Sequence, residues 1–115
     1  MAVMDFEMFE GDTFTLRATV RDEAGSIVDI TGVDISWWLA KTNKSTGADV
    51  YAQKTVGSGV EIVDGPAGRF DVTIESPDTE GRGGKTLYHE AEIDDGGVVS
   101  TVLVGKAKIK PALIP

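Results

Sequence analysis

The stretch TEGRGGKT, Thr79–Thr86, comes closest to a motif for chemistry, because it ends in Gly-Lys-Thr as a phosphate-binding loop does. Two features argue against phosphate binding. Thr79 stands where the first glycine of that motif belongs, and such a loop must open a helix whose first amides meet the phosphates. An alternating strand pattern follows here instead. We therefore interpret the stretch as a flexible loop and expect no nucleotide cofactor.

His89 is the only histidine, and the chain has no cysteine. It shares a strand face with Ala91 and Ile93, which predicts a structural, semi-buried side chain. No nucleophile-elbow motif accompanies it. One histidine without cysteine does not supply a transition-metal site. We expect no catalytic residue, no metal and no cofactor, and hence a protein that is not an enzyme.

Carboxylates are the remaining candidates for chemistry. They crowd the N-terminus at Asp5, Glu7, Glu10 and Asp12, and two more lie in the turn at 94–95. No calcium-binding EF-hand pattern contains them, so we interpret them as a solvated surface. A small hydrolase that uses two carboxylates stays open as a third hypothesis, but nothing in the sequence singles out a pair.

Composition limits the classes of function further. At 115 residues the chain is expected to be one domain, residues 1–115, and its net charge of -8 argues against nucleic-acid binding. No apolar run is long enough to span a bilayer, so we expect no membrane insertion. The N-terminus lacks a basic flank followed by an apolar stretch, which predicts synthesis in a cytoplasm without self-encoded export.

Apolar residues recur with period two along most of the chain, as in half-buried strands. The alternating runs are TFTLRATV, VDISWWLA, RFDVTIES, LYHEAEI and VVSTVLVGKAKIK. Gly105 within the last run suggests a bulge or bend. Turn residues separate the runs, and Asp95-Gly96 marks the clearest hairpin. No helical period exceeds one turn. The pattern predicts an all-β fold, an immunoglobulin-like antiparallel β-sandwich of about seven to eight strands.

Two adjacent tryptophans must point in opposite directions in such a strand. Trp37 is in phase with Ile35 and Leu39, which predicts a place in the core. Trp38 then faces outward with Ser36. Two interpretations stay open: a loop or the N-terminal segment covers Trp38, or Trp38 anchors a contact with a partner.

The order of these pieces resembles immunoglobulin-like domains of tailed-bacteriophage virion proteins, such as the N-terminal domain of baseplate upper proteins. The resemblance rests on Gly11-Asp12, on the turn Asp22–Gly25 and on the segment Val28–Gly32 before the aromatic strand. The closing VGKAKIKP is similar as well. Leu87 departs from the pattern, which often has an aromatic residue there.

The resemblance implies a non-enzymatic structural component of a virion, made in the host cytoplasm, in a capsid-surface, tail or baseplate position. Its partners would be other virion proteins and copies of itself. The candidate interface residues are Trp38, Tyr51, Tyr88, Phe9, Leu113 and Ile114. Apolar residues at both ends dock on a neighbour or fold back, and we favour docking for the C-terminal tail. The alternative is a carbohydrate-binding module for a host-surface glycan, with Trp38, Tyr51 and Tyr88 as a stacking platform.

Overall fold

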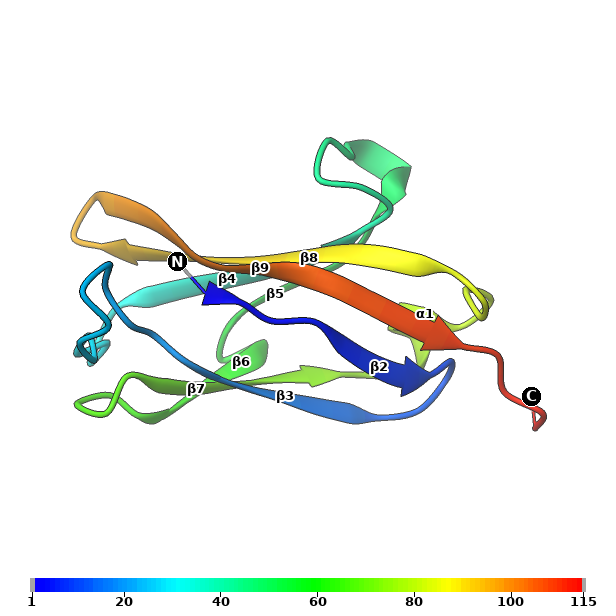
Figure 1. The fold of residues 1–115 in the computed structure, drawn as a ribbon, viewed down its shortest axis with the longest axis horizontal. Coiled ribbons are helices and arrows are strands. Elements are labelled where there is room, and N and C mark those ends of the chain that lie inside the picture. The colour runs from blue at the N-terminus through cyan, green and yellow to red at the C-terminus, as the bar shows by residue number, and fades with distance from the viewer. Residues whose placement is uncertain (1, 115) are drawn as a thin grey trace.

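The computed structural model describes residues 2–114, most of which lie in strands (Figure 1). The strands are β1 (Ala2–Val3), β2 (Phe6–Phe9), β3 (Phe14–Thr19), β4 (Asp34–Ala40), β5 (Val50–Val56), β6 (Gly59–Asp64), β7 (Arg69–Ile74), β8 (Thr86–Asp95) and β9 (Val98–Lys110). Two helical turns interrupt them, η1 (Gly47–Asp49) and α1 (Ser76–Thr79). The expectation of a mostly β chain with no helix beyond a single turn is confirmed.

The strands form one mixed sheet that curls on itself. Their order is β1-β9-β8-β4-β5-β6-β7-β3, and β2 also pairs with β9. β1 and β2 run parallel to β9, and β5 runs parallel to β6. The sequence pattern predicted two separate antiparallel sheets. The structure differs because the short β5–β6 pair continues the hydrogen bonding from one layer into the other.

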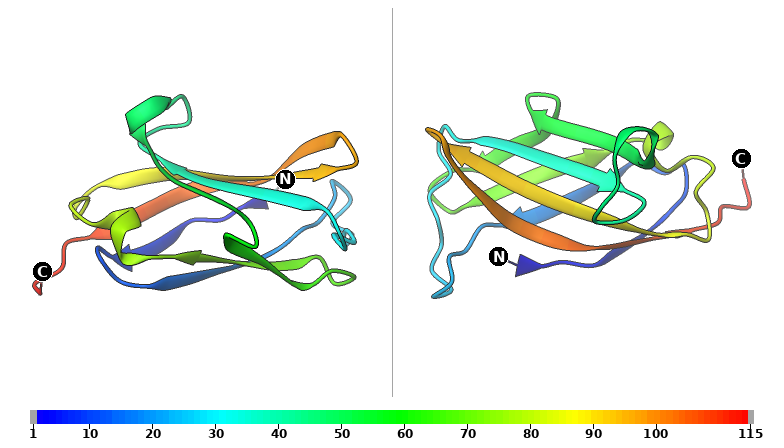
Figure 2. Two further views of the ribbon diagram at one scale, coloured as in Figure 1. Left: turned by 180° about the vertical axis from the view of Figure 1, so that it is seen from behind. Right: turned by 90° about the horizontal axis from the view of Figure 1, so that it is seen from above.

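The chain passes between the layers at this β5–β6 corner (Figure 2). Thr55 pairs with Gly59, and the Ser58 N–H donates to the Thr55 carbonyl oxygen at 2.8 Å. Gly59 has a φ of +100°, and a Cβ there would lie 2.6 Å from Cδ of Lys54. Glycine therefore serves both the turn and the path of the Lys54 side chain. The corner places β6, β7 and β3 opposite β4, β8 and β9.

The core lies between these layers and is built by the predicted alternation. Inward residues of β4 and β8 pack against those of β3 and β7, and the buried set includes Leu16, Ala18, Ile35, Trp37, Leu39, Phe70, Val72, Ile74, Leu87, Ala91 and Ile93. Phe14, in phase with the buried Leu16 and Ala18 on β3, is only partly buried. Its ring stacks on that of Phe6 with centroids 5.2 Å apart. This contact joins β3 to β2 across the side of the curled sheet where these two strands share no backbone pairing.

The N-terminal segment folds back on its own sheet. The sequence left open whether this segment docks on a neighbour or folds back. In the structure it folds back, because β1 and β2 pair with the edge of β9. Met8 is buried, and Met4 N–H donates to the Val104 carbonyl oxygen at 2.8 Å. The C-terminal tail beyond Lys110 instead extends from the end of the sheet (Figure 1).

The β8–β9 hairpin confirms the turn predicted at Asp95-Gly96, with Gly96 and Gly97 as its loop. Both glycines have positive φ, 60° and 97°, as the favoured two-residue hairpin turn requires. The irregularity in β9 was predicted at Gly105, but the pairing shifts near Val102 instead. Gly105 leaves room for the Met4 carbonyl group, whose carbon a Cβ at 105 would approach to 2.6 Å.

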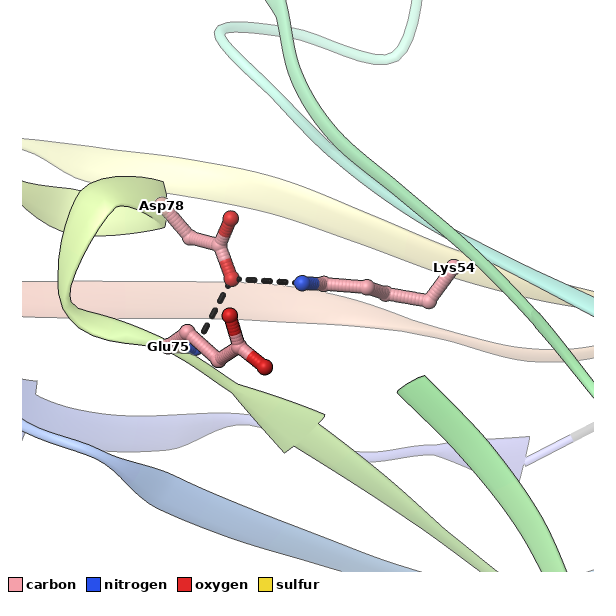
Figure 3. A network of polar contacts seen from close by, with 3 residues as sticks. All are labelled: Lys54, Glu75 and Asp78. Atoms are coloured by element: carbon pink, nitrogen blue, oxygen red, sulfur yellow. Dashed lines mark hydrogen bonds and ion pairs between the residues drawn. The ribbon is translucent and has the colours of Figure 1, made fainter. Parts of the chain in front are cut away.

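A half-buried ion pair braces the connection from β7 to β8 (Figure 3). Lys54 lies on the inward side of β5, opposite Trp37. Its Nζ is 2.9 Å from Oδ2 of Asp78 in α1, and the same oxygen accepts the Glu75 N–H at 2.8 Å. The sequence predicted a flexible loop over Thr79–Thr86, but Thr79 belongs to α1 and Thr86 begins β8. The capping bond and the lysine hold that turn against the sheet.

We expect the Lys54→Met substitution to lower the free energy of unfolding by about 1–3 kcal/mol, because it leaves the Asp78 carboxylate half-buried without its cation. Urea denaturation measures the change. Lys110→Met is the matched control, since its pair with Glu7 spans 3.9 Å between more exposed side chains. It should change stability by less than about 0.5 kcal/mol. Equal effects of the two substitutions would contradict a bracing role for Lys54.

Candidate functional site

The two adjacent tryptophans separate as the alternation predicts. The exposed fraction of Trp37 is 0% and that of Trp38 is 45%. Trp37 pairs across the sheet with Ala91, whereas Trp38 pairs with Gln53 on one side and Glu90 on the other. One indole therefore belongs to the core, and the other faces outward from the middle of the sheet.

Trp37 begins a buried chain of hydrogen bonds. Its Nε1–H donates to Nδ1 of His89 at 3.1 Å, and Nε2 of His89 bonds to the Met4 carbonyl oxygen at 2.6 Å. An indole N–H only donates, so Nδ1 must accept and the ring proton must sit on Nε2. The neutral Nε2–H tautomer of His89 thus satisfies both partners and ties β8 to the N-terminal segment.

The environment of His89 keeps it neutral. Burial lowers the pKa of the imidazole, and the hydrogen bond to Met4 and the charge of Asp5 oppose this without reversing it. The ring is fully buried, with Phe6 edge-on at 5.0 Å between centroids. The prediction of a structural histidine is confirmed, with deeper burial than the semi-buried position expected. A ring without solvent contact and with both nitrogens bonded has no route to a substrate.

The glycine loop that resembles a phosphate-binding motif holds a carboxylate of this chain. The Gly81 and Gly83 N–H groups both donate to Oε2 of Glu10 at 3.1 Å. Oε1 of Glu10 accepts the Ala112 N–H at 3.3 Å, so one side chain joins the loop to the C-terminal tail. The loop amides do bind an anion, but that anion is internal.

The N-terminal carboxylates are therefore more than the solvated surface that the sequence predicted. Glu10 organises the 81–83 loop, and Asp5 accepts the Lys106 N–H through Oδ1 at 2.8 Å. Neither role could be predicted from the sequence. The partner of Asp5 is 101 residues away along the chain, and the Gly81 partner of Glu10 is 71 residues away. The one available signal was the glycine-rich loop, whose amides need an acceptor.

The outward side of β4, β5 and β8 forms the most distinctive surface, which we call the Trp38 face. It comprises Asp34, Ser36, Trp38, Gln53, Thr55, Tyr88, Glu90, Glu92 and Asp94. Ser36, Trp38, Glu90 and Glu92 line a shallow depression of about 340 Å³. An exposed indole flanked by carboxylates suits contact with a cationic or polar ligand.

Tyr88 lies on the Trp38 face, and Tyr51 does not. The Tyr88 hydroxyl donates to Oε1 of Glu90 at 2.8 Å, and burial together with this carboxylate raises the pKa of Tyr88 to about 12. At Tyr51 the β4–β5 pairing shifts register, so its side chain packs against the core. The Arg82 guanidinium covers the Tyr51 ring 3.6 Å from its centroid. The structure therefore does not bring Trp38, Tyr51 and Tyr88 together as one platform.

The remaining interface candidates gather at the end of the molecule where β2 and β9 finish. Leu113 and Ile114 have exposed fractions of 97% and 82% and border a groove with Glu10–Asp12. Phe9 is exposed at the end of β2, where it pairs with Lys110 of β9. The Nζ of Lys110 lies 4.3 Å from the centroid of the Phe9 ring. This end is separate from the Trp38 face. Sequence reasoning missed a further exposed pair, Val98 and Val99 at the β8–β9 hairpin tip.

Residues 2–114 contain neither a metal-binding cluster of side chains nor a membrane-spanning helix. No group of three or more histidine, cysteine or acidic side chains has a metal-binding arrangement there. Neither helical turn in this part of the chain is long or apolar enough to cross a bilayer.

Comparison with known proteins finds similarity in structure but not in sequence. No protein-family model matches the sequence, and no curated protein matches it. Among solved structures, the chain is similar to the N-terminal domain of ORF48 of phage TP901-1, with a TM-score of 0.54. The match covers 95% of this chain and 85% of that one, at 11% sequence identity. The two share a fold. At this identity the likeness carries no residue-level function.

The buried neutral histidine predicts a loss of stability at mildly acidic pH. The unfolded chain gains a proton on His89 below the ordinary histidine pKa of 6.5, whereas the folded chain, with a lowered pKa, does not. The free energy of unfolding should therefore fall as pH drops below about 6.5, by at most about 1.4 kcal/mol for each pH unit. Urea denaturation at several pH values measures the slope.

Because His89 is the only histidine, its ring resonances report its protonation directly. We expect them to stay in the neutral form at a pH where a histidine in an unstructured peptide is protonated. A His89→Gln variant should lose the slope between about pH 6.5 and the carboxylate range. A ring that titrates in the folded protein with an ordinary pKa would contradict the bonding scheme.

Proposed function

We propose that this chain is a non-enzymatic structural component of a tailed-phage virion that acts through contacts with other proteins. The observation that carries the proposal is the similarity in fold, over nearly the whole chain, to the N-terminal domain of ORF48 of phage TP901-1. Among the capsid-surface, tail and baseplate positions, we favour the baseplate, because the sequence also resembles the N-terminal domain of phage baseplate upper proteins. The partners would be other virion proteins and copies of this chain.

The finer fold assignment, an immunoglobulin-like domain, belongs to the same proposal. Strand order supports it once the short β5–β6 corner is set aside. The layers β3-β7-β6 and β9-β8-β4-β5 then follow, in chain order, strands B-E-D and G-F-C-C′ of a variable-type immunoglobulin domain. The C″ strand has no counterpart, and the N-terminal strands pair with β9 instead of β3. The buried Trp37 also lies on the strand that carries the core tryptophan in that fold.

The character of the side chains agrees with a contact role. The only histidine is buried and fully bonded, and the phosphate-loop-like amides hold Glu10. In contrast, Trp38, Phe9, Leu113 and Ile114 expose apolar surface at two separate places. Apolar side chains at separate surfaces suit a subunit with more than one neighbour. Tyr88 lies on the first of these surfaces. Tyr51 lies on neither, because it packs against the core beneath the Arg82 guanidinium.

Mass spectrometry of density-purified particles from the phage or prophage that encodes this chain tests the proposal. We expect its peptides at a constant ratio to the other virion proteins across the particle peak. A phage-encoded enzyme of DNA metabolism serves as the control and should be absent from the peak. Loss of the chain from the particle fractions, with expression in the infected cell, would contradict a virion role.

A further inference from the structure

The Trp38 face carries a charge that the described chain does not balance. Four carboxylates lie on it, namely Asp34, Glu90, Glu92 and Asp94. The ion pairs among residues 2–114 join Arg17 to Asp71, Lys54 to Asp78 and Lys110 to Glu7. None of these pairs includes a carboxylate of the Trp38 face.

The strand register explains why these charges stay uncompensated. Glu92 lies between Ser36 on β4 and Thr101 on β9, and Asp94 lies between Asp34 and Val99. Glu90 lies between Trp38 and Val104, and its carboxylate accepts only the Tyr88 hydroxyl. The lysines of neighbouring β9 are Lys106, Lys108 and Lys110, all beyond the other end of the acidic stretch. Lys106 pairs with Tyr88, and Lys108 pairs with Thr86.

The like charges of this arrangement oppose folding. Asp34 and Asp94 are direct cross-strand neighbours, and like charges in that position destabilise a sheet. Every second residue of β8 from Glu90 to Asp94 is acidic, so Glu90, Glu92 and Asp94 share one side of the strand. Successive members of this row lie about 7 Å apart. An indole left half-exposed in the middle of the face adds a further cost in water. Two bonds on the face support the fold, from the Gly97 N–H to Oδ1 of Asp94 and from the Tyr88 hydroxyl to Glu90, each at 2.8 Å. Neither supplies a cation. A cationic neighbour would remove the remaining repulsion and cover the indole.

We propose that the Trp38 face docks a basic surface of a partner protein, with an arginine side chain seated in the depression beside Trp38. This inference deepens the proposed function and rests on it, because it names the chemistry of one virion neighbour. The guanidinium plane stacks on the indole while its N–H groups reach the Glu90 and Glu92 carboxylates. Arginine suits the site better than lysine because it is planar and presents several donors at once.

A second copy of this chain fits the face less well. Each copy has a net charge of -8, so two copies repel each other at long range. Two exposed arginines lie on the opposite layer. Arg17 of β3 already pairs with Asp71 at 3.7 Å, and Arg69 of β7 lies in register with Asp64. Charge complementarity therefore favours a different, basic protein.

The two indole N–H resonances of a ¹⁵N-labelled sample test the proposal, with a short oligo-arginine peptide as the probe. Trp38 should shift in a saturable manner together with the Glu90 and Glu92 amides. Trp37, whose N–H is held by His89, should not shift and serves as the internal control. No shift of Trp38, or a diffuse shift of exposed acidic residues over the whole surface, would overturn the proposal.

A matched pair of variants separates this face from general charge attraction. Glu90→Gln with Glu92→Gln, and Glu23→Gln with Glu61→Gln, change the net charge equally, and the second pair lies on exposed positions elsewhere. The first pair should weaken peptide binding by about threefold to tenfold, and the second by less than about twofold. Equal weakening by both variants would overturn the proposal.

Two other occupants give distinct results in the same experiment. A Trp38 shift that depends on protein concentration without peptide would identify a second copy as the occupant and overturn a basic partner. A Trp38 shift with neutral oligosaccharides, and none with the peptide, would identify a glycan and overturn it likewise. Failure of peptide binding leaves the particle mass spectrometry unaffected, so the two proposals fail separately.

Discussion

The hydrogen-bonded chain from the Trp37 indole through His89 to the Met4 carbonyl is the interaction on which the rest of the structure depends. It fixes Trp37 and His89 on the inner side of two neighbouring strands. Side chains alternate along a strand, and a slip of one residue would turn every side chain to the other side. With these two residues fixed inward, Trp38 and Glu90 must face outward. The same bonds that complete the core therefore define the surface that we propose as an interface.

The chain of bonds also accounts for the edge of the sheet. Met4 reaches His89 only because Gly105 leaves its carbonyl group room beside β9. That approach draws the N-terminal segment along β9 as β1 and β2. The parallel strands in turn bring Glu10 to the glycine loop and Phe6 onto Phe14. Local packing around the buried His89 imidazole thus positions the N-terminal strands and the 81–83 loop. It also closes the side of the curled sheet where β2 and β3 share no backbone hydrogen bonds.

Several features could be predicted from the sequence, because each depends on neighbours within a few residues. They are most of the strands, the inward Trp37, the outward Trp38 and the Gly96-Gly97 hairpin. The β5–β6 corner and the parallel N-terminal strands were not predictable in this way. They depend on contacts between distant residues, such as Lys54 with Asp78 and Met4 with His89. The bulge that turns Tyr51 toward Arg82 is of the same kind. The acidic residues of β8 were visible in the sequence, but their meaning appears only when the register shows that no cation lies opposite Glu92 or Asp94.

The central claim is that the outward side of β4 and β8 is a contact surface in the assembled particle. Photo-cross-linking from position 38 tests it most directly, with a photoreactive phenylalanine analogue in place of Trp38 and, as a control, in place of the exposed Glu61. In intact particles, position 38 should cross-link to a different virion protein within a segment rich in arginine or lysine, and position 61 should not yield that product. Particles that contain the labelled chain but give no cross-link from position 38 would contradict the account.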